Sequence, residues 1–153
     1  MMAYTVETGC IKQISVFLEN KAGTLNEMLG VISGAGVNLL ALCIADTTDF
    51  GIVRLIVAGH DVDKTLAALR AAGLIARETS IICLRVSHEP GAFARVLDLL
   101  ADAGISIEYA YSFCRSTLED ALLIVRPSNL DLSLEVLGSN DVPLVTQRMV
   151  DEF

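Results

Sequence analysis

The strongest constraint on the fold is an internal repeat. The segment ENKAGTLNEMLGVISGAGVN, residues 19–38, returns as SHEPGAFARVLDLLADAGIS, residues 87–106. The offset is 68 residues, and it aligns Gly23 with Gly91 without a gap. A register held along both halves of the chain indicates two copies of one structural unit. Since loops carry the chemistry of most small modules, the duplication also predicts two equivalent loops in which to search for a site.

The period of the apolar residues changes along each copy in the order strand, helix, strand, strand, helix, strand. In the first copy strands are predicted near 14–18, 37–45, 52–58 and 74–78, with helices starting near residues 24 and 61. In the second copy the corresponding strands are predicted near 82–86, 105–113, 121–126 and 142–148. The order is that of the ferredoxin-like split βαβ fold.

We therefore predict an α+β protein of two βαββαβ units, residues 10–78 and 79–150. The two units are expected to pair edge to edge into one antiparallel sheet of roughly eight strands, with the helices on one face. The other face then needs a cover, which predicts a homodimer packed through the face without helices.

Composition excludes several classes of partner. The chain has 153 residues, of which 53% are apolar, so it can bury a sizeable core. The net charge of −8 opposes binding to nucleic acid or to an anionic membrane surface. The sequence has neither an apolar run that would span a bilayer nor a signal peptide, and we expect a cytoplasmic protein. Cysteines occur without a C-x-x-C pair, which indicates no disulfide framework and no metal site: Cys10, Cys43, Cys83 and Cys114.

Two short motifs carry a more specific signal. ENKAGTL, residues 19–25, followed by GVNLLAL, residues 36–42, resembles the signature of ACT domains, which are regulatory amino-acid-binding modules. It is especially similar to the serine-binding domain of phosphoglycerate dehydrogenase. The likeness covers roughly residues 11–150 and so implies a tandem ACT protein with no attached enzyme.

The resemblance also implies where a ligand binds. In that family the amino acid lies between two modules, against the first strand–helix loop of one and the start of the second strand of the other. Asn20 and Asn38 match the two ligand-binding asparagines, and Gly23 matches the loop glycine. An asparagine amide both donates and accepts hydrogen bonds, as a zwitterion requires, and a helix N-terminus favours a carboxylate. The alternative is that these residues merely serve a helix cap, a turn and a chain reversal.

The ligand-binding set implied by the resemblance comprises both loops and both strand starts: Asn20, Lys21, Ala22, Gly23, Thr24, Leu25, Asn38, Leu39, His88, Glu89, Pro90, Gly91, Ala92, Phe93, Ser106 and Ile107. The second copy departs from the family pattern, because His88 replaces Asn20 and Ser106 replaces Asn38. Sites shared across an interface would pair Asn20 with Ser106 and His88 with Asn38. Two unequal sites are therefore expected, in which His88 either binds a carboxylate or stays solvated.

The function expected from these features is that of a non-catalytic sensor. Its ligand would be a free amino acid, its partner a metabolic enzyme, and it would need no cofactor or metal. Two alternatives stay open. One is a small ferredoxin-like enzyme that uses Cys43, Cys114 or His88, although the sequence shows no nucleophile paired with a base. The other is a structural dimerisation module with vestigial sites.

Overall fold

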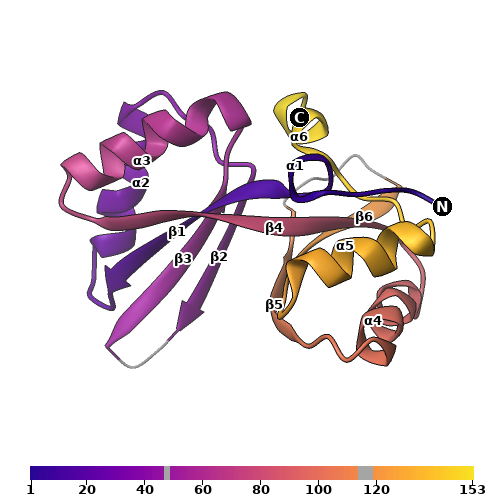
Figure 1. The fold of residues 1–153 in the computed structure, drawn as a ribbon. Coiled ribbons are helices and arrows are strands. Elements are labelled where there is room, and N and C mark those ends of the chain that lie inside the picture. Colours follow the sequence, from indigo (N-terminus) through magenta and orange to yellow (C-terminus); the bar gives the residue numbers. More distant parts are fainter. Residues whose placement is uncertain (47–48, 114–118) are drawn as a thin grey trace. The chain divides into compact units, whose positions relative to one another are not determined.

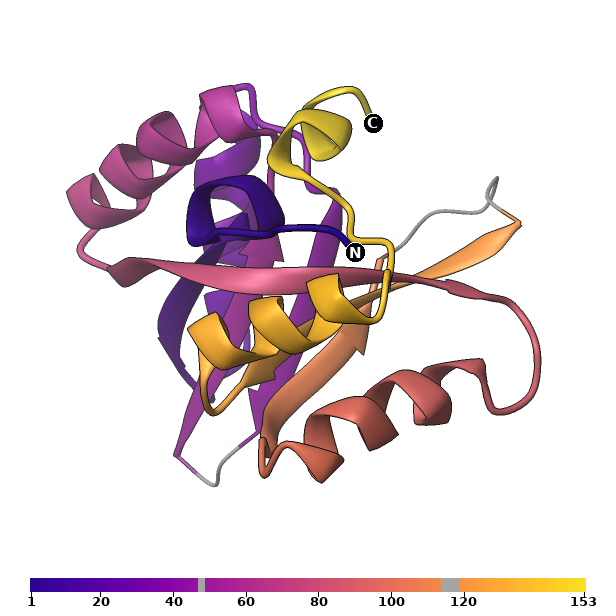
Figure 2. The same ribbon diagram turned by 45° about the vertical axis from the view of Figure 1, so that its right-hand side comes forward.

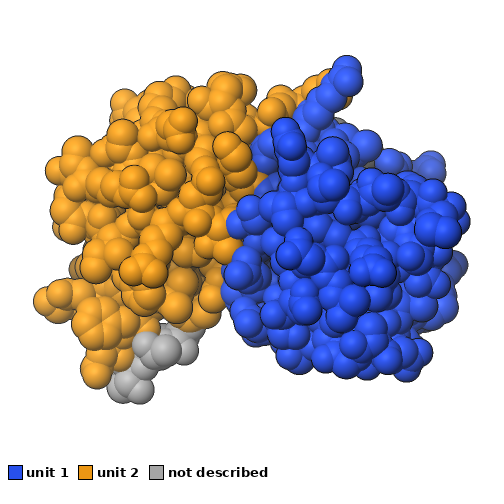
Figure 3. Space-filling view, in the orientation of Figure 1, with its two compact units in different colours: residues 1–11, 80–149 blue, residues 12–79, 150–153 orange. Residues whose placement is uncertain are grey.

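The computed structural model describes residues 1–46, 49–113 and 119–153. The chain divides into two compact units, coloured separately in Figure 3. Unit 2 consists of residues 12–79 and 150–153, and unit 1 consists of residues 1–11 and 80–149. Unit 2 thus holds the first copy of the repeat and unit 1 the second, while each chain terminus joins the unit of the other copy.

Unit 2 is a sheet with two helices on one face (Figure 1). Its elements are β1 (Ile11–Glu19), α2 (Thr24–Gly34), β2 (Ala41–Asp46), β3 (Phe50–Ile56), the 3₁₀ turn η1 (Gly59–Asp61), α3 (Val62–Ala71) and the start of β4 (Ile75–Ser87). The strand order is β2-β3-β1-β4, and β1 and β2 both run antiparallel to β3.

Unit 1 repeats this plan. It contains α1 (Val6–Gly9), the rest of β4, α4 (Ala92–Asp102), β5 (Ile107–Ser112), β6 (Asp120–Pro127), α5 (Leu130–Ser139) and the start of α6 (Gln147–Asp151). The strand order is β4-β6-β5, and β6 is antiparallel to both neighbours. The predicted α+β class and the antiparallel sheet are confirmed. No helix in the described parts of the chain is long and apolar enough to cross a membrane.

The two cores are built from the predicted alternation. In unit 2, Ile14, Val16 and Leu18 of β1 are buried against Met28 of α2 and Leu69 of α3. The strand residues 68 positions later do the same in unit 1, where Ile82, Leu84 and Val86 of β4 are buried with Leu100 of α4 and Leu137 of α5. A strand with a period of two presents every second side chain to one face, so the intervening residues must point away from the helices.

The expected eight-stranded sheet is wrong, because the described residues form six strands. The first of the two missing strands is explained by the joining of two predicted strands. The strands predicted near 74–78 and 82–86 are one continuous strand, β4, which Figure 2 shows unbroken. Residues 75–87 contain neither glycine nor proline, the residues that most readily end a strand, so the chain keeps an extended conformation throughout.

The second missing strand is the one predicted near 142–148. Here the chain makes a single bridge, between Leu84 and Leu144, bracketed by hydrogen bonds from Arg85 N–H to the Pro143 carbonyl (3.1 Å) and from Val145 N–H to the Cys83 carbonyl (2.8 Å). Pro143 has no N–H with which to extend the ladder. Beyond the bridge the chain turns into α6, where the Thr146 hydroxyl accepts the Met149 N–H at 3.3 Å.

Two helical glycines should respond in opposite ways to alanine. Gly30, in the middle of α2, is exposed, and a Cβ there would meet no atom within 4 Å. Gly30→Ala should therefore raise the free energy of unfolding by about 0.5 to 1 kcal/mol, the usual gain within a helix. A Cβ on Gly138 of α5 would instead overlap the backbone carbonyl of Met2, whose N–H donates to the Gly138 carbonyl at 2.8 Å. Gly138→Ala should lower the free energy of unfolding by roughly 1 to 3 kcal/mol.

Urea denaturation of the two variants and the parent measures both changes. If Gly138→Ala were as stabilising as Gly30→Ala, the packing of the N-terminal segment on α5 would be refuted.

Candidate functional site

The two predicted loops have the same backbone geometry. In unit 2 the loop between β1 and α2 closes through hydrogen bonds from Lys21 N–H to the Glu19 carbonyl (2.9 Å) and from Thr24 N–H to the Lys21 carbonyl (3.3 Å). In unit 1 the corresponding bonds, 68 residues later, run from Glu89 N–H to Ser87 (2.9 Å) and from Ala92 N–H to Glu89 (3.3 Å). The repeat therefore extends to the details of both loops.

Each loop turns through a glycine in a left-handed conformation. Gly23 has φ 90° and Gly91 has φ 82°, and each directly precedes its helix. A side chain with a Cβ is strained in this region, so glycine is required by the backbone whatever the loop binds. The two glycines that marked the repeat thus have a structural reason that is independent of any ligand.

Side chains distinguish the loops. In unit 2 the Thr24 hydroxyl donates to the carbonyls of Glu19 (2.8 Å) and Lys21 (3.0 Å), whereas Ala92 of unit 1 has no hydroxyl. Lys21 Nζ pairs with the Glu19 carboxylate at 2.6 Å, and this hydrogen bond raises the pKa of Lys21. In unit 1 the loop carboxylate of Glu89 pairs instead with a guanidinium on α4, that of Arg95, at 2.5 Å.

The structure places the predicted residues at the surface or near it. Exposed positions are Asn20, Lys21, Ala22, Gly23, Asn38, His88, Glu89, Pro90, Gly91 and Ser106. Half-buried positions are Thr24, Leu25, Leu39, Phe93 and Ile107, and Ala92 is buried. A backbone hydrogen bond holds Asn20 in place, because its N–H donates to the Asp49 carbonyl at 2.9 Å.

A single unit does not bring its own two predicted ligand-binding positions together. Asn20 precedes α2 and Asn38 follows it, so the helix Thr24–Gly34 separates them by roughly 16 Å at 1.5 Å per residue. The same holds for His88 and Ser106 at the two ends of α4. A complete site of the family type therefore needs a second unit, and the pairing of Asn20 with Ser106 stays a prediction.

Sequence reasoning missed two features of the site region. One is Ser128, whose Oγ accepts the Ser106 N–H at 3.1 Å while its own N–H donates to the Ser106 carbonyl at 2.8 Å, fixing the start of the strand that Ser106 precedes. The other is a groove beside each loop. No short motif marks either groove, because the lining comes from segments that are far apart in the sequence.

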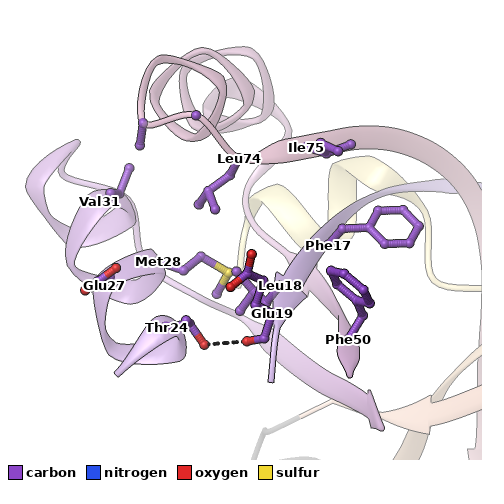
Figure 4. Close-up of a pocket in the computed structure, with 12 residues that line it drawn as sticks. Phe17, Leu18, Glu19, Thr24, Glu27, Met28, Val31, Phe50, Leu74 and Ile75 are labelled. Carbon is purple, nitrogen blue, oxygen red and sulfur yellow. Dashed lines mark hydrogen bonds between the residues drawn. The ribbon is translucent and has the colours of Figure 1, made fainter. Parts of the chain in front are cut away.

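The groove of unit 2, which we call the apolar groove, has a volume of about 390 Å³. Its walls come from the end of β1, from α2, from the start of β3 and from the α3–β4 turn (Figure 4). The main lining side chains are Phe17, Met28, Val31, Phe50, Leu74 and Ile75, with Glu19 and Glu27.

The groove of unit 1, which we call the arginine groove, measures about 310 Å³. Every described residue that lines it lies 68 positions after a residue that lines the apolar groove. They include Arg85, Arg95, Asn140, Asp141 and Pro143. The repeat has therefore produced two equivalent hollows with different chemistry.

With this geometry established, known proteins can be compared. The family model described as an ACT domain pair matches residues 9–153. The chain belongs to this family. The resemblance in ENKAGTL and GVNLLAL is thus confirmed. No curated protein matches this chain.

Solved structures include two informative neighbours of this ACT pair. Protein BT0572 from Bacteroides thetaiotaomicron is 38% identical, with a TM-score of 0.87 over 96% of this chain and 99% of the other. The regulatory subunit of aspartate kinase from Thermus thermophilus, in a ligand-free form, is 14% identical, with a TM-score of 0.62 over 88% of this chain and 95% of that subunit. The second likeness shows the fold alone.

The thiols of the ACT pair that are buried are poor nucleophiles. Burial raises the pKa of Cys83 to about 12, and burial together with the nearby Asp131 raises that of Cys10 to about 11. Because the thiolate is the reactive form, both residues are protonated thiols near neutral pH. Cys43 is half-buried on β2, and Cys114 lies outside the described residues. Within the described ranges no three His, Cys, Asp or Glu side chains gather to hold a metal ion.

The buried Cys83 thiol makes stability depend on pH. Its pKa is about 12 in the folded protein against 9.0 for an ordinary thiol, so above pH 9 the unfolded chain loses this proton first and stability falls. The parent should lose about 2 kcal/mol through this residue between pH 8 and pH 10.5, at 1.36 kcal/mol per pKa unit. Cys83→Ala should lack that loss.

Urea denaturation of parent and Cys83→Ala at both pH values gives the difference, and any fixed cost of the substitution cancels. Equal pH dependence in the two proteins would contradict the burial of this thiol.

Proposed function

We propose that this ACT pair is a non-catalytic regulatory protein that binds a free α-amino acid at its strand–helix loops. The observation that carries the proposal is the pair of loops with matching backbone geometry, one of which presents Asn20 at the surface in front of α2. A regulatory role is supported by the shared fold with the regulatory subunit of aspartate kinase. The partner would then be a metabolic enzyme whose activity responds to the amino acid.

The chemistry of a zwitterion fits such a loop. Its carboxylate needs hydrogen-bond donors, and the first turn of α2 or α4 directs backbone N–H groups toward the loop. Its ammonium needs acceptors, which an asparagine amide oxygen supplies. Asn20 and Asn38 would each offer both kinds of group from one side chain, and their exposure leaves them accessible to a ligand.

The two sites would differ in strength. His88 and Ser106 replace the asparagines in unit 1, and Ala92 replaces Thr24. A serine offers one donor in place of the two of an asparagine amide, and a neutral histidine ring offers one donor and one acceptor. We propose that Asn20 pairs with Ser106 and His88 with Asn38, so that each ligand would meet one asparagine.

Self-association through the helix-free face also remains a proposal. Light scattering tests it directly, since a homodimer has twice the 16.4 kDa mass of one chain. A monomer at micromolar concentration would refute the homodimer and leave the ligand proposal unaffected.

Calorimetric titration of variants tests the ligand sites. A thermal-shift screen against free amino acids first identifies the ligand, since binding to the folded state alone raises the apparent stability. Asn38→Ala should then weaken one site by about one to two orders of magnitude, as expected when a charged group loses a hydrogen bond. His88→Ala should act on that same site, whereas Ser106→Ala should act on the other.

Ser33→Ala, an exposed change in the last turn of α2, is the matched control and should bind like the parent. If no amino acid bound, the structural-module alternative would be favoured. If an amino acid bound but all three site variants matched the control, the position of the site would be wrong although the function stood.

A further inference from the structure

One hydroxyl holds the backbone on both sides of Asn20. The Thr24 Oγ reaches the carbonyls of Glu19 at 2.8 Å and Lys21 at 3.0 Å, and these are the residues directly before and after Asn20. Figure 4 shows the bond to Glu19 as a dashed line at the start of α2. The Asn20 N–H is itself bonded to the Asp49 carbonyl at 2.9 Å. Together these bonds fix the backbone from which the Asn20 side chain extends.

The backbone of Ser106 is also held on both sides, although the hydroxyl comes from another segment. Ser128 lies between β6 and α5, and its Oγ accepts the Ser106 N–H at 3.1 Å. The Ser128 N–H donates in return to the Ser106 carbonyl at 2.8 Å. Both backbone groups of Ser106 are thus engaged by a single residue, just before β5 begins.

The loop of unit 1, which carries His88, lacks the first of these hydroxyls. Ala92 takes the position of Thr24 and has only a methyl group as its side chain. The backbone hydrogen bonds of the two loops match, so the difference lies in the side chains. The ion pair between Glu89 and Arg95 joins two exposed side chains, and such pairs constrain a loop weakly.

The strand start of unit 2, which carries Asn38, lacks the second hydroxyl. His60 takes the position of Ser128, and its ring nitrogen Nε2 lies 3.6 Å from the Asp61 carboxylate. Among the residues that the structure describes, none accepts the Asn38 N–H. A segment without such bonds keeps more conformational freedom, and a ligand must remove that freedom when it binds.

We propose that the site shared by Asn20 and Ser106 is the stronger of the two, and that Thr24 and Ser128 are its positioning residues. This inference rests on the proposed amino-acid function, and it adds which site is stronger and which residues decide the order. Both hydroxyls act on the backbone of a residue that would meet the ligand, so neither has to touch the ligand itself. A site that is ordered before binding loses less conformational entropy when the ligand arrives.

The number of hydrogen-bond donors does not separate the two sites. Each site has one asparagine, and its second member, Ser106 or a neutral His88, has one side-chain donor. The order of the affinities therefore follows from how firmly these groups are held, since both members of one pair are positioned and the two hydroxyls are missing from the other.

Amide hydrogen exchange of the ligand-free full chain tests the positioning directly. After correction for intrinsic rates, the Ser106 N–H should exchange about tenfold more slowly than the Asn38 N–H, because a hydrogen-bonded amide exchanges only on local opening. Ser128→Ala should remove this difference. His60→Ala, the equivalent change in unit 2, is the matched control and should leave both rates unchanged. Equal rates in the parent would overturn the proposal.

Calorimetric titration tests the consequence for binding. The probe is whichever of the standard amino acids gives the largest thermal shift. Ser106→Ala should weaken the tighter site and Asn38→Ala the looser one. Thr24→Ala and Ser128→Ala should each raise the Kd of the tighter site about fivefold, the usual effect of one lost hydrogen bond, and leave the Kd of the looser site unchanged.

Conservative variants distinguish positioning from a general loss of stability. Thr24→Ser and Ser128→Thr keep the hydroxyls, so both proteins should bind like the parent. Ala92→Thr adds a hydroxyl to the loop of unit 1, whose backbone hydrogen bonds match those around Thr24. This variant should lower the Kd of the looser site about fivefold.

The outcomes separate this inference from the function on which it rests. If an amino acid bound but Asn38→Ala weakened the tighter site, the inference would be overturned and the amino-acid function would stand. The same conclusion would follow if Thr24→Ala and Ser128→Ala both bound like the parent. If none of the standard amino acids bound although the exchange rates were as expected, the proposed function would fail and this inference with it.

Discussion

The burial of one face of the first strand in each unit is the constraint on which the rest of the structure depends. Ile14, Val16 and Leu18 of β1 face α2 and α3, and this pattern fixes the register of the strand. A shift by one residue would move the whole apolar set to the opposite face. Because Val16 and Leu18 are core residues, Phe17 between them must point away from the helices. The end of the strand in turn sets where the loop before α2 begins.

Duplication has kept this backbone and changed what it presents. Unit 1 buries Leu84 and Val86 as its core pair, so Arg85 takes the outward position that Phe17 has in unit 2. The loop hydrogen bonds match between the units, yet the chemistry of the loops and grooves differs. Backbone geometry is maintained by the core and by Gly23 and its counterpart Gly91, whereas exposed side chains were free to diverge. The repeat has therefore produced two surfaces with the same backbone geometry and different side-chain chemistry.

Much of the fold was readable from periodicity, and the errors lie in the last predicted strand of each copy and in two short helices. The core of each unit, the helices and their order followed from the apolar spacing. The separate strands predicted on either side of Thr79 are one strand, because nothing in the intervening residues ends an extended segment. The strand predicted near 142–148 does not form, and next to Pro143 the chain makes one bridge instead of a continuous ladder of hydrogen bonds. The short helices α1 and α6 have four and five residues, too short for a helical period to appear in the sequence.

The sequence by itself determined the family, the duplicated loops and the side chains that each loop carries, because these depend on local order along the chain. Only the tertiary structure decided that residues of β1, α2, β3 and the start of β4 line one groove. These residues come from three strands and a helix, and no spacing in the sequence records their distance in space. It also decided that one helix separates Asn20 from Asn38 within a unit, because a helix of fixed rise per residue keeps its two ends apart.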